Sequence, residues 1–252
     1  MRPSVKAAVA LADVATVAGV IALWQSDSAA TASYLSKPSA VFAAIKVWLT
    51  NSTLLGYIPV TLWEAAAGML IALAAATVIA SLLAASSRAA SIFEPFMALG
   101  NAAPRIALAP LFLLIFGTDL KSKVIFVATS VVFIPFFSIF RALTTVDQDL
   151  LNNARCLGAG RFAIVREVYI PAVTSSVVAS LRVTVAFSLL TAILAEYLAS
   201  QEGIGYEIQQ AQNNLQANYA IAGVVIIALI AVIIDMALRL IERRALVWRD
   251  PS

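Results

Sequence analysis

The sequence has no histidine and a single cysteine, Cys156, and these absences exclude several classes of site. A chain without histidine lacks the commonest general base and the commonest metal ligand. One cysteine excludes an intrachain disulfide and any paired-cysteine metal or redox motif. The chain also has no G-x-x-x-x-G-K-[ST] phosphate-binding loop. An ATPase, if one is involved, must therefore be another chain.

Charged residues are also scarce, and this scarcity points to a membrane. Asp, Glu, Lys and Arg make up 12% of the 252 residues, hydrophobic residues make up 62%, and the mean hydropathy is +0.92. Because a soluble domain carries about 25% charged residues, this chain has too few to cover a water-facing surface, and a bilayer is the simplest solvent for it. The basic pI of about 9.2 has a membrane explanation too, since basic residues gather on the cytoplasmic face. No nucleic-acid partner is expected.

Six apolar runs can cross a bilayer as helices, each of which needs about 20 mostly apolar residues. The predicted fold is an all-α polytopic membrane protein with a single transmembrane domain over residues 1–252. The third run contains Pro95, Pro104 and Pro110, and kinks are plausible there because proline frees backbone carbonyls. The six predicted spans cover residues 7–24, 57–85, 93–116, 123–140, 172–199 and 219–241.

The distribution of lysine and arginine predicts that both termini lie in the cytoplasm, as an even number of spans allows. With the N-terminus inside, eleven basic residues fall on the cytoplasmic side and four fall outside, in keeping with the positive-inside rule. The inside set is Arg2, Lys6, Arg88, Arg141, Arg155, Arg161, Arg166, Arg239, Arg243, Arg244 and Arg249, and the outside set is Lys37, Lys46, Lys121 and Lys123.

The N-terminal run has a second interpretation. Arg2 and Lys6 precede it and Ala30-Thr31-Ala32 follows it, which resembles a secretory signal with a small-residue cleavage site. We favour a retained helix because the polar stretch 25–28 separates the run from that site; cleavage would leave five spans. Residues 25–56 form the longest extracytoplasmic piece, and its apolar pattern predicts an interfacial helix lying on the membrane. The residues of that pattern are Val41, Phe42, Ile45, Val47, Trp48 and Leu49.

The polar loop over residues 143–171 is the most informative segment. Its first half has apolar residues at helical spacing, and Asp147 or Asp149 can cap the helix start. Gly158 and Gly160 are expected to end the helix by adopting positive φ. A second short helix, 162–169, is predicted to follow at an angle, with Pro171 restarting the chain into the fifth span. A bent helix pair with exposed apolar residues fits a groove on a partner.

At these residues the loop resembles the EAA loop of ABC importer permeases. The family pattern is Glu-Ala-Ala, three residues, Gly, a spacer and an apolar-Pro pair. The chain has Asn152-Asn153-Ala154, three residues, Gly158, and then Ile170-Pro171. Asn152 replaces the family Glu, so an ion pair from that position to the ATPase is not expected. Glu64-Ala65-Ala66-Ala67-Gly68 lies inside a span and has the wrong spacing. The coupling residues that the resemblance implies are Asn152, Asn153, Ala154, Arg155, Leu157, Gly158, Ala159, Arg161 and Pro171.

Further segments are similar to the nitrate, sulfonate, taurine and bicarbonate subfamily of these permeases. They are Ala103-Pro104 with Pro110-Leu111-Phe112 and Phe116-Gly117, and Leu181-Arg182 with Ala195-Glu196 and Gly203-Ile204-Gly205-Tyr206. The resemblance implies a type I importer permease in a bacterial cytoplasmic (inner) membrane. Two copies would form the pathway and two separate ATPase subunits, which carry ATP and Mg, would dock on the loops. A periplasmic or lipid-anchored binding protein would deliver the solute, and this chain itself would be no enzyme.

Charged residues inside the predicted spans have two interpretations. Arg105 and Arg182 lie about 11 residues into their spans, roughly 16 Å deep at about 1.5 Å per residue, where an arginine costs at least ~2.5 kcal/mol. They would either give the pathway a positive potential for an anion or pair with buried carboxylates and fix packing. Glu196 would serve an outer gate or the binding-protein contact, or be solvated at the interface. Asp235 fits a packing partner better, and 203–206 is either a gate turn or a plain loop.

The sequence therefore predicts the permease subunit of an ATP-driven importer for a small anionic solute of the sulfonate, taurine, nitrate or carboxylate type. One alternative is a self-contained channel or secondary transporter that uses the four membrane charges. Another is a membrane scaffold that recruits a soluble protein through residues 147–171. An ATPase that co-purifies with the chain would separate the first hypothesis from the other two.

Overall fold

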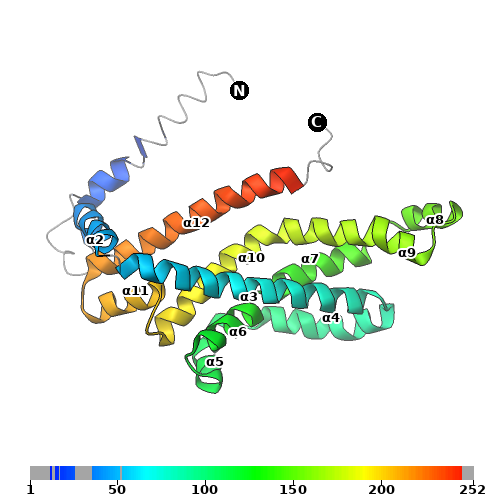
Figure 1. Cartoon of the computed structure of the whole chain (residues 1–252), viewed down its shortest axis with the longest axis horizontal. Helices are drawn as coiled ribbons and strands as arrows, with labels where there is room; N and C mark the ends of the chain where they lie inside the picture. The colour runs from blue at the N-terminus through cyan, green and yellow to red at the C-terminus, as the bar shows by residue number, and fades with distance from the viewer. Residues whose placement is uncertain (1–11, 13–14, 17, 26–35, 52, 246–252) are drawn as a thin grey trace.

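The computed structural model describes residues 12, 15–16, 18–25, 36–51 and 53–245, and every element assigned in them is a helix. The chain folds into an elongated bundle in which the long helices run between two ends (Figure 1). The helices of the first half are α2 (Pro38–Thr50), α3 (Thr53–Ala84), α4 (Ser87–Ala102), η1 (Arg105–Leu108), α5 (Ala109–Phe116), α6 (Leu120–Val131) and α7 (Phe133–Thr144). Those of the second half are α8 (Gln148–Cys156), α9 (Arg161–Ile164), η2 (Val165–Tyr169), α10 (Ile170–Ala199), α11 (Ile204–Asn213) and α12 (Ala217–Ala245).

Helix α3 is the centre of the bundle because small residues recur on one face of it. Gly68, Ala72, Ala76 and Ala80 lie four residues apart and are buried. A Cβ added to Gly68 would come within 2.5 Å of the side chain of Val127 on α6. In a membrane the hydrophobic effect does not drive helices together, and small residues allow their backbones to approach closely. This stripe of small residues therefore packs α3 against α6 and α7.

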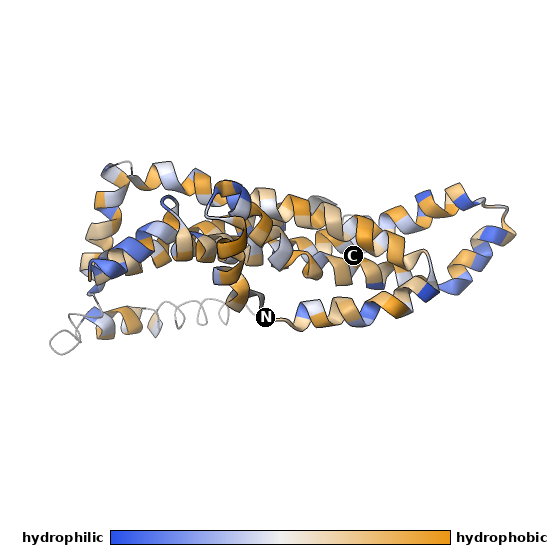
Figure 2. Cartoon of the chain, turned by 90° about the horizontal axis from the view of Figure 1, so that it is seen from below, coloured by the Kyte–Doolittle hydropathy of each residue, from blue (hydrophilic) through white to orange (hydrophobic). Residues whose placement is uncertain are grey.

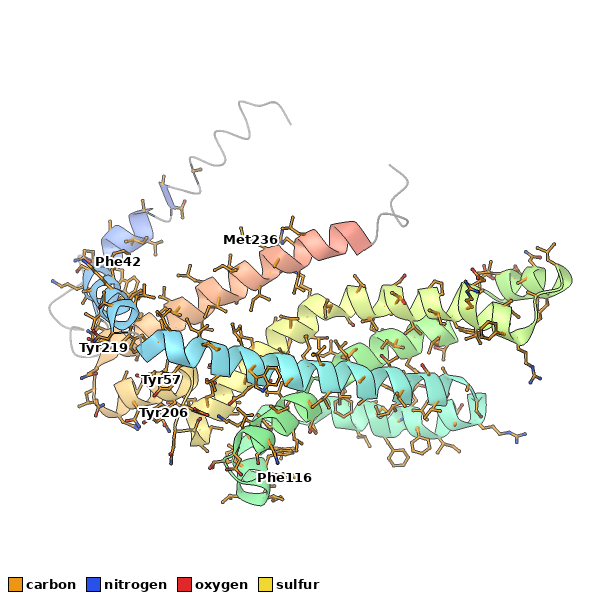
Figure 3. All side chains as sticks on the ribbon, viewed as in Figure 1. Phe42, Tyr57, Phe116, Tyr206, Tyr219 and Met236 are labelled. Atoms are coloured by element: carbon orange, nitrogen blue, oxygen red, sulfur yellow. The ribbon has the colours of Figure 1, made fainter. Side chains whose placement is uncertain are left out.

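Four helical segments among the described residues are long and apolar enough to cross a membrane: Leu54–Ala84, Leu120–Thr144, Arg161–Ala199 and Ala217–Leu240. They overlap the predicted spans 57–85, 123–140, 172–199 and 219–241, and the third begins eleven residues earlier than predicted. Large apolar side chains stay exposed along them, as Met236 on α12 illustrates (Figure 3). Figure 2 shows apolar residues along the body of the bundle. Eight of the 18 residues of the predicted span 7–24 lie outside the described residues, and the described stretch 18–25 is helical.

The predicted third span, 93–116, is divided in the structure. Helix α4 ends at Ala102, the single-turn η1 follows, and α5 is only eight residues long. The break falls at Ala103, whose φ of −60° and ψ of 136° are extended. That conformation is the one favoured before a proline, here Pro104. Consequently Arg105 is not 11 residues inside a continuous spanning helix but is the first residue of η1.

The prediction of a separate second loop helix was wrong, because α9, η2 and α10 form one continuous helix from Arg161 to Ala199. Pro171 lies inside it, where proline removes a helix hydrogen bond and its ring crowds the preceding turn. The π-helical segment Val165–Tyr169 ends just before this proline. A π segment widens the helix locally and accommodates such a conflict. The loop between α7 and this helix therefore contains only α8 and its flanks.

Helix α2 occupies most of the described part of the predicted interfacial segment, and one of its faces is packed rather than laid on a membrane. Val41, Ala44 and Trp48 are buried against α11 and α12, and Trp48 contacts the ring of Tyr219 at 5.4 Å between centroids. Phe42 on the opposite face is 73% exposed. The proposed cleavage site at 30–32 and the polar stretch 26–28 lie outside the described residues.

Candidate functional site

Helix α8 is a short helix whose two ends are both capped. Asp147 is the N-cap, and its carboxylate accepts a hydrogen bond from the backbone N–H of Asp149 at 2.8 Å, which settles the choice between the two aspartates. At the other end the N–H of Ala159 donates to Ala154 O at 3.0 Å and that of Gly158 donates to Arg155 O at 2.9 Å. These two bonds form a Schellman motif, which requires a residue of positive φ.

Gly158 supplies that residue, with a φ of +86°, as the sequence predicted. Gly160 does not: its φ is −72° and it serves as the extended N-cap of α9, so the prediction of positive φ there was wrong. A Cβ on Gly158 would meet no atom within 4 Å. The requirement for glycine at this turn is therefore set by the backbone conformation and not by space.

Helix α8 and the residues that follow it as far as Phe162, called the α8 turn below, present apolar side chains at the tip of the molecule. Leu157 is 89% exposed and Phe162 is 78% exposed, whereas Leu151 is buried and anchors α8. Figure 1 shows α8 beyond the ends of α3 and α4, and Figure 2 shows hydrophilic residues interleaved there. Two exposed apolar side chains on a capped turn are of the kind that can fit a groove on a partner.

The asparagine at the family Glu position is engaged within the loop. Asn152 Oδ1 accepts a hydrogen bond from Arg155 Nη1 at 3.3 Å, one turn further along α8. Asn152, Asn153 and Arg155 are all exposed, and Ala154 is half-buried. The structure thus brings eight of the nine sequence-predicted coupling residues to one turn over 152–161, while Pro171 lies further along the long helix.

At the opposite end of the bundle, buried charges join three helices. Lys123 of α6 forms an ion pair with Glu64 of α3, and both side chains are almost fully buried. Lys123 Nζ also donates to Ser200 Oγ at 2.9 Å, just past the end of α10. Ser200 in turn donates to Glu202 O at 2.6 Å. A buried ion pair needs such further hydrogen bonds to offset the cost of desolvation. The hydrogen bond to Ser200 therefore helps to stabilise the Lys123–Glu64 pair.

Glu196 of α10 lies beside this pair and is fully buried. Its carboxylate accepts from Thr61 Oγ1 at 2.7 Å and from the N–H of Gly205 at 2.8 Å. Thr61 Oγ1 also accepts from the N–H of Ile204 at 3.1 Å. The first two N–H groups of α11 are unsatisfied within that helix, so α3 and α10 cap α11 from outside. Glu196 is therefore neither solvated nor exposed to a partner in this state.

The turn before α11 fits closely around this carboxylate. Gly203 has a φ of +106° and a ψ of 168°, a region that is essentially restricted to glycine. A Cβ there would collide with the Glu196 carboxyl group. Tyr57 and Tyr206 meet edge to face beside it, with centroids 6.4 Å apart (Figure 3). The segment 203–206 is thus a packed joint of α3, α10 and α11 and not a plain loop.

The sequence does not reveal the roles of Glu64 and Lys123. It places Glu64 in an EAAAG stretch with the wrong spacing and Lys123 on the outer side of the membrane. One signal was available, because a carboxylate inside an apolar run needs a partner. Thr61 and Glu64, one turn apart, share a helix face. Nothing local linked either residue to Lys123 or Glu196, which lie far along the chain.

Arg182 pairs with Asp235 across α10 and α12. The guanidinium makes two hydrogen bonds to the carboxylate, one of them Nη2 to Oδ2 at 2.9 Å. Arg239 Nε lies 2.9 Å from the same carboxylate, one turn along α12. The three side chains stay partly exposed, at 43%, 31% and 58% respectively, and Arg182 and Asp235 line a cavity of about 360 Å³. The structure pairs Arg182 with Asp235, as the packing interpretation of these two residues requires. The three side chains together carry a net charge of +1.

Comparison with known proteins gives one family and several transport permeases. The family described as binding-protein-dependent transport system inner membrane component matches residues 68–247. A protein named as an aliphatic sulfonates transport permease from Bacillus subtilis (strain 168) is 28% identical over 234 residues, which cover 92% of this chain and 85% of that protein. The taurine transport system permease protein of Escherichia coli (strain K12) is 27% identical over 201 residues, covering 77% and 73%.

A solved structure, the inward-facing MetNI methionine ABC transporter, has a similar fold. One of its chains superimposes with a TM-score of 0.67 at 16% sequence identity, covering 78% of this chain and 97% of that chain. At this identity the similarity concerns the fold alone. The predicted all-helical permease architecture is confirmed.

Proposed function

Because the chain belongs to the family of inner membrane components of binding-protein-dependent transport systems, we propose that it moves a small sulfonate-type anion through a pathway built from two copies. In this proposal a separate ATPase subunit docks on each α8 turn and a solute-binding protein docks at the opposite end. The chain itself holds neither ATP nor Mg, which belong to the ATPase. The membrane is the bacterial cytoplasmic membrane, with the α8 end and both termini in the cytoplasm.

The observation that carries this proposal is the capped, apolar-tipped α8 turn. Two hydrogen bonds and one glycine fix its shape, and Leu157 and Phe162 stay exposed at its tip. A rigid turn transmits a displacement better than a mobile loop. Because α9 and α10 are one helix from Arg161 to Ala199, a push on the turn would move a spanning helix directly. ATP-driven approach of two ATPases would thus change the pathway between two such helices.

The distribution of arginine supports the cytoplasmic assignment of the α8 end. Arg88 follows the turn between α3 and α4, Arg141 lies in the last turn of α7, and Arg155, Arg161 and Arg166 lie in and after α8. All five therefore lie toward the α8 end (Figure 1), on the side that the positive-inside rule assigns to the cytoplasm.

A sulfonate-type solute is supported by the relatives and by one cluster. The two permeases described above are named for aliphatic sulfonates and taurine. The Arg182–Asp235–Arg239 cluster has an excess positive charge on a partly exposed surface of α10 and α12, which would favour an anion if this surface faces the pathway. Arg105 at the start of η1 remains a second candidate for the pathway. The channel and scaffold alternatives are disfavoured because the family consists of transport components.

The test exploits the open space around Gly158. Gly158→Val places a β-branched residue at positive φ, which such residues rarely adopt, whereas Gly158→Asn is tolerated there. We expect Gly158→Val to lose ATPase co-purification and ATP-driven uptake of taurine in proteoliposomes by about tenfold or more, and Gly158→Asn to retain most of both. Equal coupling in both variants would refute the docking role. Uptake that needs no ATP would instead support a channel or secondary transporter.

A further inference from the structure

A second cavity lies behind the α8 turn, away from its exposed tip. It has a volume of about 930 Å³ and is bounded by the end of α3, by α7 and α8, and by the start of the long helix. Its walls are mostly apolar, and two guanidinium groups, those of Arg155 and Arg161, border it. Ser81, Tyr169 and Thr174 also line it, and the Thr174 hydroxyl donates to Ile170 O at 2.9 Å. We propose that this cavity binds the phosphate group of an anionic phospholipid and the part of its acyl chain nearest the headgroup.

The charge of the cavity is the first argument. Neither arginine has a carboxylate partner within the described part of the chain, and no aspartate or glutamate from that part lines the cavity. The hydrogen bond of Arg155 goes to a neutral amide, Asn152. Two arginines that line one cavity and have no carboxylate partner among the described residues match a phosphate, to which arginine binds through charge-assisted hydrogen bonds.

The position of the cavity is the second argument. Its α3 wall is formed by the last turns of the candidate span Leu54–Ala84, and its α10 wall by the first turns of the candidate span Arg161–Ala199. It therefore lies where two spans leave the apolar layer, at the depth of lipid headgroups. Val173 and Ile170 continue the apolar wall toward the membrane interior, as an acyl chain requires. If the α8 end is cytoplasmic, as proposed above, the lipid belongs to the cytoplasmic leaflet.

The π-helical segment is the third argument. Val165 and Tyr169, its first and last residues, both line the cavity. π segments are rare and cluster at functional sites, and this one widens the helix at the wall of the cavity. A bound lipid would contact this segment and the α8 helix together, and would thus stabilise the orientation of the α8 turn relative to α10.

The experiment measures lipid retention by the full-length protein and needs no ATPase. Protein purified in mild detergent is mixed with equal amounts of phosphatidylglycerol and phosphatidylethanolamine of identical acyl chains, and bound lipids are counted by native mass spectrometry. Wild type is expected to retain phosphatidylglycerol about tenfold more than phosphatidylethanolamine. The double variant Arg155→Gln, Arg161→Gln should approach equal retention. Arg166 lies on the same helix as Arg161 but does not line the cavity, so Arg166→Gln should behave as wild type.

Ser81→Phe provides a variant that fills the cavity from α3 while both arginines remain. It should lose bound phosphatidylglycerol by about tenfold as well, and an unchanged thermal unfolding midpoint without lipid shows that it folds. Equal retention of the two lipids by wild type, or retention by Ser81→Phe, would overturn the proposal. Stabilisation by inorganic phosphate alone equal to that by phosphatidylglycerol vesicles would also overturn it, in favour of a free anion. Since this readout is independent of ATPase docking, its failure would leave the Gly158 test intact.

Discussion

The two ends of the bundle treat charged residues in opposite ways. At the α8 end Arg155, Arg161 and Arg166 are exposed, and the shape of the turn comes from backbone hydrogen bonds. At the α11 end Glu64, Lys123 and Glu196 are buried and hold three helices together. The exposed end can change partners at little internal cost, whereas removing one member of the Glu64–Lys123 pair at the buried end leaves a charge without its counterion. The first end is built to be contacted, and the second to keep its own geometry.

The largest effect is expected from breaking the buried ion pair. Lys123→Met leaves the Glu64 carboxylate buried and unpaired, which should lower the free energy of unfolding by about 3–5 kcal/mol. The measurement is unfolding in a single detergent, followed by intrinsic fluorescence. Lys121→Met, an exposed lysine two residues away, is the matched control and should change stability by less than about 0.5 kcal/mol.

A second variant separates the lost charge pair from lost packing. The double substitution Lys123→Met, Glu64→Leu removes both charges and should recover most of the stability, because apolar replacement of a buried ion pair is often neutral. If Lys123→Met were as stable as the control, the contrast between the two ends would be lost, since the buried charges would then hold nothing in place.

An intermediate effect is expected from two of the glycines with positive φ, Gly158 at the α8 end and Gly203 at the α11 end. Alanine at either position forces an L-residue into a disfavoured backbone, at roughly 1–2 kcal/mol. At Gly203 the new Cβ also collides with the Glu196 carboxyl group, whereas at Gly158 it meets no atom within 4 Å. Gly203→Ala should therefore be the more destabilising by about 1–3 kcal/mol, the cost of overpacking. Thermal and denaturant unfolding of both variants in one detergent would measure this, and equal losses would contradict a tight joint around Glu196.

The sequence predicted the exposed end far better than the buried one, for a physical reason. The α8 turn depends on neighbours in the chain, since Asp147 caps the helix and Gly158 ends it within twelve residues. The spans follow from apolar runs in the same local way. In contrast, Glu64 and Lys123 meet only because the small-residue stripe of α3 admits α6 closely, and Gly203 is restricted by a carboxylate on another helix.

Two further predictions, both at prolines, were wrong for local reasons. The sequence predicts that Pro171 starts a span, but a π-helical segment lets one helix continue through it. The sequence predicts a kink at Pro104 inside a span, but the extended Ala103 before it divides the apolar run. In both places a proline indicates where the helix is disturbed. Whether the helix continues through the proline or ends before it depends on whether the preceding segment can widen.

The smallest effect is expected from pH at the α11 end. Burial raises the pKa of Glu207, on α11 and outside the candidate spans, above its ordinary value of 4.5. The folded state then holds this proton more tightly than the unfolded chain. Its contribution to stability is therefore fully present below the unfolded pKa and is lost as pH rises through the folded pKa. Glu207→Gln should gain stability relative to wild type as pH rises above about 4.5, measured by denaturant unfolding at matched pH. A difference that stays constant with pH would mean that Glu207 is as well solvated as the exposed charges near α8, which would narrow the contrast to the Glu64–Lys123–Glu196 cluster.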